Sequence, residues 1–313
     1  TVISGGTLKL GTGALCGASP GAACSGSGQT LYSSAVGVGN VTINGGGTLD
    51  LNGNNFGDVA LGSQPAIVMN GTNASTAVAT LNNSSTSSSV TVYGGISFTM
   101  QSAAVGLVNI ISQNTGSATL TIAGTLADTG STTATDLQVG ATSNTGTVIF
   151  SNTGNSYAGN TTVTASTTLR LGAAGVLPDG ANKGNITVNG TLDLNGFNET
   201  INGLSGSGTV DNTSTTASAV LTVGANNQTS TFSGVIQNTG SGHTLAITKT
   251  GTGTLTLGNS TTNSTYSGGT TVNGGTLKAG YSNAPFGSGA VTEISTGEVV
   301  IDLNGQTISN ALN

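Results

Sequence analysis

The stretch GTLTLGNSTTNSTYSGGTTVNGGTLKAG, residues 253–280, decides the fold. Aliphatic residues alternate with Thr, Ser and Asn, and the alternating runs break at Gly-Gly and Asn-Gly pairs. Strict alternation is the pattern of a half-buried β-strand, and the Gly-containing pairs supply the positive φ angles that tight turns need. No segment shows a helical period of useful length. The sequence therefore predicts an all-β chain.

The same unit recurs along the 313-residue chain. Tyr157 and Tyr266 occupy the same place in two copies 109 residues apart, and so do Leu192 and Ile301. We therefore expect one continuous β-helix over residues 1–313, built from repeated super-units. The first super-unit is divergent and expanded and the last is partial; they cover approximately residues 1–144, 145–253 and 254–313.

A shorter period of about 20–24 residues runs inside each super-unit. An all-β chain with this period is typical of a parallel β-helix, in which each rung stacks on the one before it at about 4.8 Å. This predicts a β-solenoid of roughly 14 rungs. A series of β-sandwich domains is the alternative, but such domains repeat every 90–100 residues or so and have no shorter period.

The composition excludes several classes of function. Charged residues are 5% of the chain, against about 25% in an average globular protein. Hydrophobic residues make up 35% and lie in regular strands, which argues against disorder. Five Lys and Arg residues cannot form the basic surface that nucleic acid needs. No apolar run approaches the roughly 20 residues of a membrane span, and the first residues lack a signal-peptide pattern. We expect no nucleic-acid partner and no membrane insertion by this chain.

The few charges repeat with the strands. A cation follows Thr-Leu in three copies, and an aspartate follows about one rung later; these residues are Lys9, Arg170 and Lys278, and Asp50, Asp193 and Asp302. The separation is 23 residues in the second copy and 24 in the third. In the first copy it is 41, and an 18-residue insertion accounts for the excess.

We expect each cation to lie on the outer face directly beneath the aspartate of the next rung, as a structural ion-pair slot. Such pairs contribute roughly 0.2–1 kcal/mol each, and a slip of one residue would turn the charges into the core. A solvated pair with no effect on stability is the alternative. An Asn-Gly turn, rather than a stacked asparagine ladder, is expected after each aspartate, at Asn52, Asn195 and Asn304.

Cys16 and Cys24 lie in a loop rich in Gly, Ala and Ser, and their spacing matches neither a redox motif nor a zinc motif. We expect a disulfide between them, which would contribute roughly 2–3 kcal/mol and would indicate an oxidising, extracytoplasmic setting. Two free thiols are the alternative.

Motifs for catalysis are missing. Glycoside hydrolysis needs two carboxylates about 5–9.5 Å apart, and the 11 acidic residues form no local pair, although adjacent rungs could supply one each. His243 has no Ser–Asp pattern nearby, and there is no nucleotide, phosphate or calcium-repeat motif. We expect no enzyme, no cofactor and no metal site. Ice binding by outward Thr residues is a weaker alternative, because their spacing looks irregular.

Residues 252–277 combine the run TGTLTL, a Tyr-x-Gly-Gly-Thr turn and a final VNGGTL. This combination resembles the passenger-associated transport repeat of bacterial autotransporters, also called the autotransporter-associated β-strand repeat. A looser copy, in which YAGNTT replaces YSGGTT, lies at 145–169. The resemblance extends over 145–308, 1–11 and 46–53. It implies a right-handed parallel β-helix that is exported to the bacterial surface, and cysteine pairs that are close in sequence.

The resemblance leads to an expected function. We expect a structural, non-catalytic segment of an exported bacterial surface protein, acting as a rigid stalk or as the subunit of an extracellular fibre. The fibre would grow by self-association of end rungs, because neither end shows a capping signal. An adhesin module that binds surface glycans or host or neighbour-cell receptors is the main alternative, with 57–135 as its seat. A β-helical polysaccharide-degrading enzyme is the third.

Overall fold

A computed structural model of the chain describes most of its residues in strands and turns, and no helix occurs among them. The described residues are 1–10, 30–31, 40–57, 65–71, 78–99, 108–129, 134–141, 144–258, 263–280, 284–294 and 297–313. The chain divides into two compact units. The N-terminal unit comprises Thr1–Gly159 and Ser166–Thr168, and the C-terminal unit comprises Asn160–Ala165 and Leu169–Asn313. The continuity of the solenoid over residues 1–313 and the limits of the super-units stay predictions.

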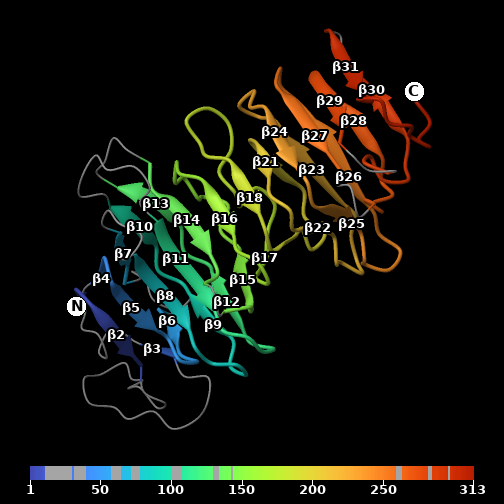
Figure 1. Cartoon of the computed structure of the whole chain (residues 1–313). Coiled ribbons are helices and arrows are strands. Elements are labelled where there is room, and N and C mark those ends of the chain that lie inside the picture. Colours follow the sequence, from blue (N-terminus) through green and yellow to red (C-terminus); the bar gives the residue numbers. More distant parts are fainter. Residues whose placement is uncertain are drawn as a thin grey trace. The chain divides into compact units, whose positions relative to one another are not determined.

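The N-terminal unit is a parallel β-solenoid with three sides (Figure 1). The first sheet contains β1 (Val2–Ile3), β4 (Val41–Asn44), β7 (Ile67–Asn70), β10 (Ile96–Thr99) and β13 (Leu126–Thr129). The second contains β2 (Gly6–Lys9), β5 (Gly47–Asp50), β8 (Ala79–Asn83), β11 (Val108–Gln113) and β14 (Asp136–Val139). The third contains β3 (Thr30–Leu31), β6 (Asn55–Phe56), β9 (Val90–Val92), β12 (Thr119–Ile122) and β15 (Thr147–Phe150). The chain therefore adds one strand to each sheet per turn.

The C-terminal unit is built in the same way (Figure 1). One set of strands comprises β16 (Thr161–Val163), β18 (Ile186–Val188) and β21 (Leu204–Ser205), and a second comprises β17 (Thr168–Leu171), β19 (Thr191–Asp193), β22 (Thr209–Asp211) and β25 (Val235–Gln237). A five-stranded sheet contains β20 (Glu199–Ile201), β23 (Ala219–Val223), β26 (Leu245–Lys249), β28 (Thr270–Val272) and β30 (Val291–Glu293). A four-stranded sheet contains β24 (Ser230–Phe232), β27 (Thr254–Leu257), β29 (Gly275–Ala279) and β31 (Val299–Asp302).

Aliphatic residues stack in columns inside each unit. In the C-terminal unit, Leu192, Val210 and Ile236 are in register on β19, β22 and β25 and are buried. Outward positions carry Thr, and on the five-stranded sheet one column is regular, with partners Thr200, Thr222, Thr248, Thr271 and Thr292. The outward Thr spacing is therefore regular on this sheet, contrary to the irregular spacing expected from the sequence.

The number of turns is smaller than predicted. Contacts between neighbouring turns join Thr99 to Thr129 in the N-terminal unit, 30 residues apart. In the C-terminal unit, Arg170 contacts Asp193, 23 residues away. Within the part of the chain that the structure describes, the strands form fewer turns than the roughly 14 predicted, so the predicted rung count was wrong. The period of 20–24 residues came from copies in the C-terminal half, whereas a turn of the N-terminal unit spans 30 residues.

Glycines without room for a side chain allow the turns to stack closely. A Cβ at Gly240 would overlap the carbonyl oxygen of Ser214 in the turn before, whereas a Cβ at Gly242 would meet nothing within 4 Å. We expect Gly240→Ala to lower the free energy of unfolding by about 2 kcal/mol, because the turn must move away from its neighbour. Gly242→Ala, with φ of +79°, should cost about 1 kcal/mol from backbone strain alone. Urea unfolding measures both, and equal losses would contradict the stacking argument.

Candidate functional site: the repeated charged corner

The structure brings together all three cation–aspartate pairs singled out in the sequence. The distance is 2.7 Å from Arg170 Nε to Asp193 Oδ2. It is 3.1 Å from Lys278 Nζ to Asp302 Oδ2, and 3.6 Å from Lys9 Nζ to Asp50 Oδ2. In each pair the two residues lie on neighbouring parallel strands, at the last or next-to-last position of the strand.

Each aspartate also shapes the turn that follows it. Its Oδ1 accepts the backbone N–H of the asparagine two residues later, at 3.1, 2.9 and 2.8 Å for Asn52, Asn195 and Asn304. These asparagines have φ of 46°, 50° and 51°, and the glycine after each also has positive φ. Only Gly and, less readily, Asn adopt this left-handed conformation without large strain. The Asp-Leu-Asn-Gly run therefore forms a turn whose Asn and Gly are the residue types that best tolerate the positive φ found there.

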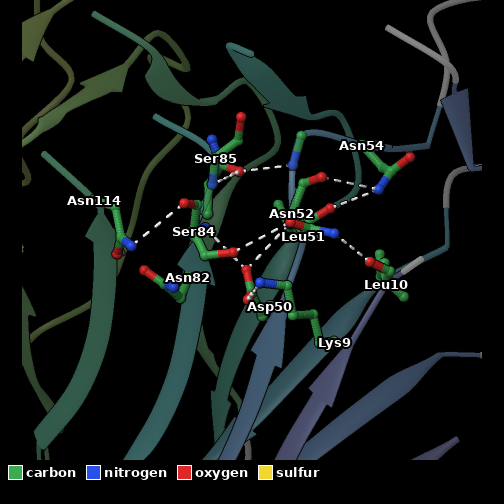
Figure 2. Close-up of polar contacts among 12 residues, drawn as sticks. Lys9, Leu10, Asp50, Leu51, Asn52, Asn54, Asn82, Ser84, Ser85 and Asn114 are labelled. Atoms are coloured by element: carbon green, nitrogen blue, oxygen red, sulfur yellow. Dashed lines mark hydrogen bonds and ion pairs between the residues drawn. The ribbon is translucent and has the colours of Figure 1, made fainter. Parts of the chain in front are cut away.

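The asparagine side chain ties the turn to the preceding rung. Asn52 Nδ2 donates to the carbonyl oxygen of Leu10 at 2.7 Å, next to the cation Lys9 (Figure 2). Asn195 Nδ2 makes the same bond to Leu171, next to Arg170, at 3.1 Å. Cation, aspartate and asparagine thus form one unit, here called the charged corner, that bridges two rungs.

In the first two copies the aspartate of the corner lies much deeper than its cation. The side chain of Asp193 is 1% exposed and that of Asp50 is 6% exposed, whereas that of Asp302 is 39% exposed. The next rung covers the first two: Ser84 N–H donates to Asp50 Oδ1 at 2.9 Å, and Thr213 donates to Asp193 through its N–H and its hydroxyl. Residues of the following turn thus close over Asp50 and Asp193, which their sequence positions did not indicate.

Polar columns continue from the corner into turns that carry no cation. In the C-terminal unit, Asp211 pairs in register with Asp193, is buried, and accepts from Gln237 Nε2 at 2.8 Å and from the N–H and hydroxyl of Thr239, both at 2.9 Å. In the N-terminal unit, Ser112 Oγ donates to Asn82 Oδ1 at 2.8 Å, in the column of Asp50. These members were not predicted from the sequence, because no opposite charge marks them.

The structure also contains a buried lysine that the sequence analysis missed. Lys249 is 0% exposed, and its Nζ donates to the carbonyl oxygens of Thr250, Gly251 and Gly274 at 2.6, 2.8 and 3.1 Å. Its column neighbours, Val223 and Val272, are aliphatic. Burial lowers the pKa of Lys249 to about 8. The alternation in LAITK places the residue inward, but a lysine at a strand end is normally assigned to the surface.

A second missed group is Glu199, on β20, which is 2% exposed. Its carboxylate accepts the backbone N–H groups of Val176 and Leu177, each at 3.1 Å. Three residues later, the Asn202 side chain donates to the carbonyl oxygens of Gly180, Lys183 and Gly184. Both side chains hold the segment 172–184, which contains no strand.

The described residues offer few other groups that could form a metal, catalytic or ligand site. No group of three His, Cys, Asp or Glu residues there could hold a metal ion. His243 is half-buried in the turn before β26. A shallow hollow of about 140 Å³ lies beside β28 and is lined by glycines and by Ser267, Thr271 and Thr292. None of the described structure is a helix with the length and hydrophobicity needed to cross a bilayer. Cys16, Cys24 and their expected disulfide lie outside the described residues.

These observations define a parallel β-solenoid whose turns repeat a charged corner. A family model described as the passenger-associated-transport-repeat matches residues 143–171 and 247–279. Both matched segments contain the buried tyrosine of their copy and end one residue after the cation of a charged corner, Arg170 or Lys278.

A relative with a matching sequence is the adhesin BmaC autotransporter of Brucella suis biovar 1 (strain 1330). It is 35% identical over 182 residues, which cover 58% of this chain and 5% of the relative. The chain thus spans a small part of that adhesin's length. No solved structure matches. The chain carries autotransporter passenger repeats, and its localisation is extracellular or at the cell surface.

Proposed function

We propose that the chain is a structural, non-catalytic segment of an exported surface protein and acts as a rigid β-solenoid stalk. The observation that carries this proposal is that the repeated carboxylates already bind neighbouring groups of the chain. Asp193 accepts hydrogen bonds from Arg170, from the N–H of Asn195 and from the N–H and hydroxyl of Thr213. A carboxylate engaged in this way has no lone pair available for a substrate, a proton or a metal ion.

The six charged-corner residues, Lys9, Arg170, Lys278, Asp50, Asp193 and Asp302, would then set the register of successive rungs. A parallel strand can slip along its neighbour unless something marks its position, and a slip of one residue reverses inside and outside. The corner marks position through one ion pair and one turn together. Removing the cation alone should therefore weaken the marking less than removing the aspartate, which serves both.

An adhesin module is the second candidate, and the name of the Brucella relative favours it. In this case the chain itself would bind a glycan or a cell receptor, through residues between 57 and 135. Assembly of the chain into a fibre stays a prediction. Negative-stain electron microscopy across a dilution series tests it, since filaments would lengthen with concentration and isolated rods would not.

The experiment that separates stalk from adhesin uses the surface-displayed protein that carries this chain. One variant deletes the chain, and a second replaces it with an unrelated β-solenoid of the same length. For a stalk, we expect the length-matched replacement to retain bacterial adhesion to host cells and the deletion to reduce it. Loss of adhesion in both variants, with surface display verified by antibody binding to intact cells, would instead assign the binding to this chain.

A further inference from the structure

The chain contains eight Asn-Gly pairs. Seven of them lie between two described rungs, and the eighth, Asn304–Gly305, borders a described rung on one side only. An asparagine followed by glycine can react with its own main chain, because glycine has no Cβ to hinder the approach of its nitrogen to the asparagine side chain. The reaction uses two groups, the side-chain amide of the asparagine and the backbone N–H of the glycine. A hydrogen bond on either group must break before the reaction occurs.

In the charged corners both groups are held by hydrogen bonds. At Asn195 the side-chain Nδ2 donates to the carbonyl oxygen of Leu171 at 3.1 Å. The N–H of Gly196 donates to Asn212 Oδ1 of the next rung at 2.8 Å. The corner at Asn52 is held in the same way on both sides. The stacking of rungs therefore protects these asparagines from reaction.

The next four pairs are each held by at least one hydrogen bond. Three bonds fix the Asn202 amide on carbonyl oxygens of the loop 172–184. Asn70 and Asn44 bond to each other through their side chains at 3.0 Å. The pair at 189–190 has an exposed asparagine, but the N–H of its glycine donates to a carbonyl oxygen of the preceding rung at 3.2 Å.

Asn273–Gly274, in the turn between β28 and β29, is different. Asn273 is exposed, and among the described residues neither its side-chain amide nor the N–H of Gly274 makes a hydrogen bond. Two bonds to Lys249 hold the turn. The N–H of Asn273 donates to the Lys249 carbonyl oxygen at 2.8 Å, and the Gly274 carbonyl oxygen accepts from Lys249 Nζ at 3.1 Å. Neither bond involves a group that reacts.

We propose that Asn273–Gly274 is a self-modification site, at which the folded chain converts asparagine to aspartate and isoaspartate. The Gly274 nitrogen gives its proton to hydroxide and attacks Cγ of Asn273. The new N–Cγ bond closes a succinimide ring, the Cγ–Nδ2 bond breaks, and ammonia leaves. Water then opens the ring at either carbonyl. One product is aspartate, and the other is isoaspartate, whose main chain runs through the former side chain.

The isoaspartate product alters the contact with the buried lysine. Only Asn273 and Gly274 separate β28 from β29, and isoaspartate adds one methylene to the main chain of this turn. The Gly274 carbonyl oxygen is one of the three that hold the Lys249 amine. Because a longer turn carries this oxygen away from the amine, the isoaspartate product is less stable than the unmodified chain. The aspartate product keeps the length of the turn and the contact.

Incubation of the full chain in mildly alkaline buffer, followed by digestion and mass spectrometry, tests the site. Asn189 is the matched control, because Thr-Val-Asn-Gly is the local sequence at both places. We expect Asn273 to convert on the order of tenfold faster than Asn189, since the Gly190 N–H must first leave its acceptor. In urea-unfolded chain the two rates should become equal. Equal rates in the folded chain, or faster conversion in the charged corners, would overturn the proposal.

Two variants test the consequence for Lys249. Asn273 is exposed, so Asn273→Gln and Asn273→Asp should both fold. Glutamine resists the reaction, because its longer side chain would have to close a larger ring, and aspartate reproduces one product without the other. We expect the urea midpoint of the incubated wild type to fall below that of Asn273→Asp, while that of Asn273→Gln does not change with incubation. An incubated wild type that contains isoaspartate at 273 and is as stable as Asn273→Asp would overturn the link to Lys249.

Discussion

Asp193→Ala is expected to lower the free energy of unfolding by about 3 kcal/mol, because it removes a buried acceptor and leaves its hydrogen-bond donors unsatisfied. The Arg170 guanidinium loses the oxygen 2.7 Å from its Nε. The N–H of Asn195 and the N–H and hydroxyl of Thr213 lose their acceptor as well. The turn at Asn195 would also lose the bond that stabilises its left-handed φ of 50°. Urea unfolding at pH 7 measures the loss.

Asp302→Ala is the matched control, because it occupies the same slot with a side chain that is 39% exposed. The backbone N–H of Asn304 and then Lys278 hold the pKa of the Asp302 carboxyl below its ordinary value, but water can replace both partners. We expect this variant to unfold at nearly the wild-type urea concentration. Equal losses for Asp193→Ala and Asp302→Ala would show that burial of the corner does not decide its contribution.

Lys249→Ala is expected to cost about 3–5 kcal/mol, for a different reason. The substitution leaves a cavity where the side chain lay and removes the donor of three carbonyl oxygens, those of Thr250, Gly251 and Gly274. With a pKa of about 8, the amine is still protonated at pH 7 and can make all three bonds. An unsatisfied buried carbonyl is costly, since no water reaches it.

Two further variants separate the cavity from the lost hydrogen bonds. Lys249→Met fills most of the volume but donates nothing, so we expect a loss between those of the alanine variant and the wild type. Lys278→Ala removes a half-exposed lysine whose partner is a half-exposed aspartate, and we expect little change. If Lys249→Met proved as stable as the wild type, the three carbonyl contacts would contribute nothing and packing alone would explain the site.

Much of the fold followed from the sequence because its information is local and repeated. Alternation sets which residues face inward, and the copies around Tyr157 and Tyr266 show that the same pattern recurs along the chain. The spacing from Arg170 to Asp193 measures one rung, so their contact could be anticipated. The expected rung count failed in the N-terminal unit, where the turns are longer and carry no clear copy from which their period could be measured.

The sequence by itself determined the parallel β-solenoid and the residues of the charged corner, because both depend on periodic spacing along one chain. Only the tertiary structure decided how deeply each charge lies. Burial depends on what the next turn places above a residue, and sequence spacing carries no such information. For this reason Asp193 is covered while Asp302 is not. For the same reason Lys249 lies buried against three carbonyl oxygens, and Glu199 lies beneath a loop rather than in water.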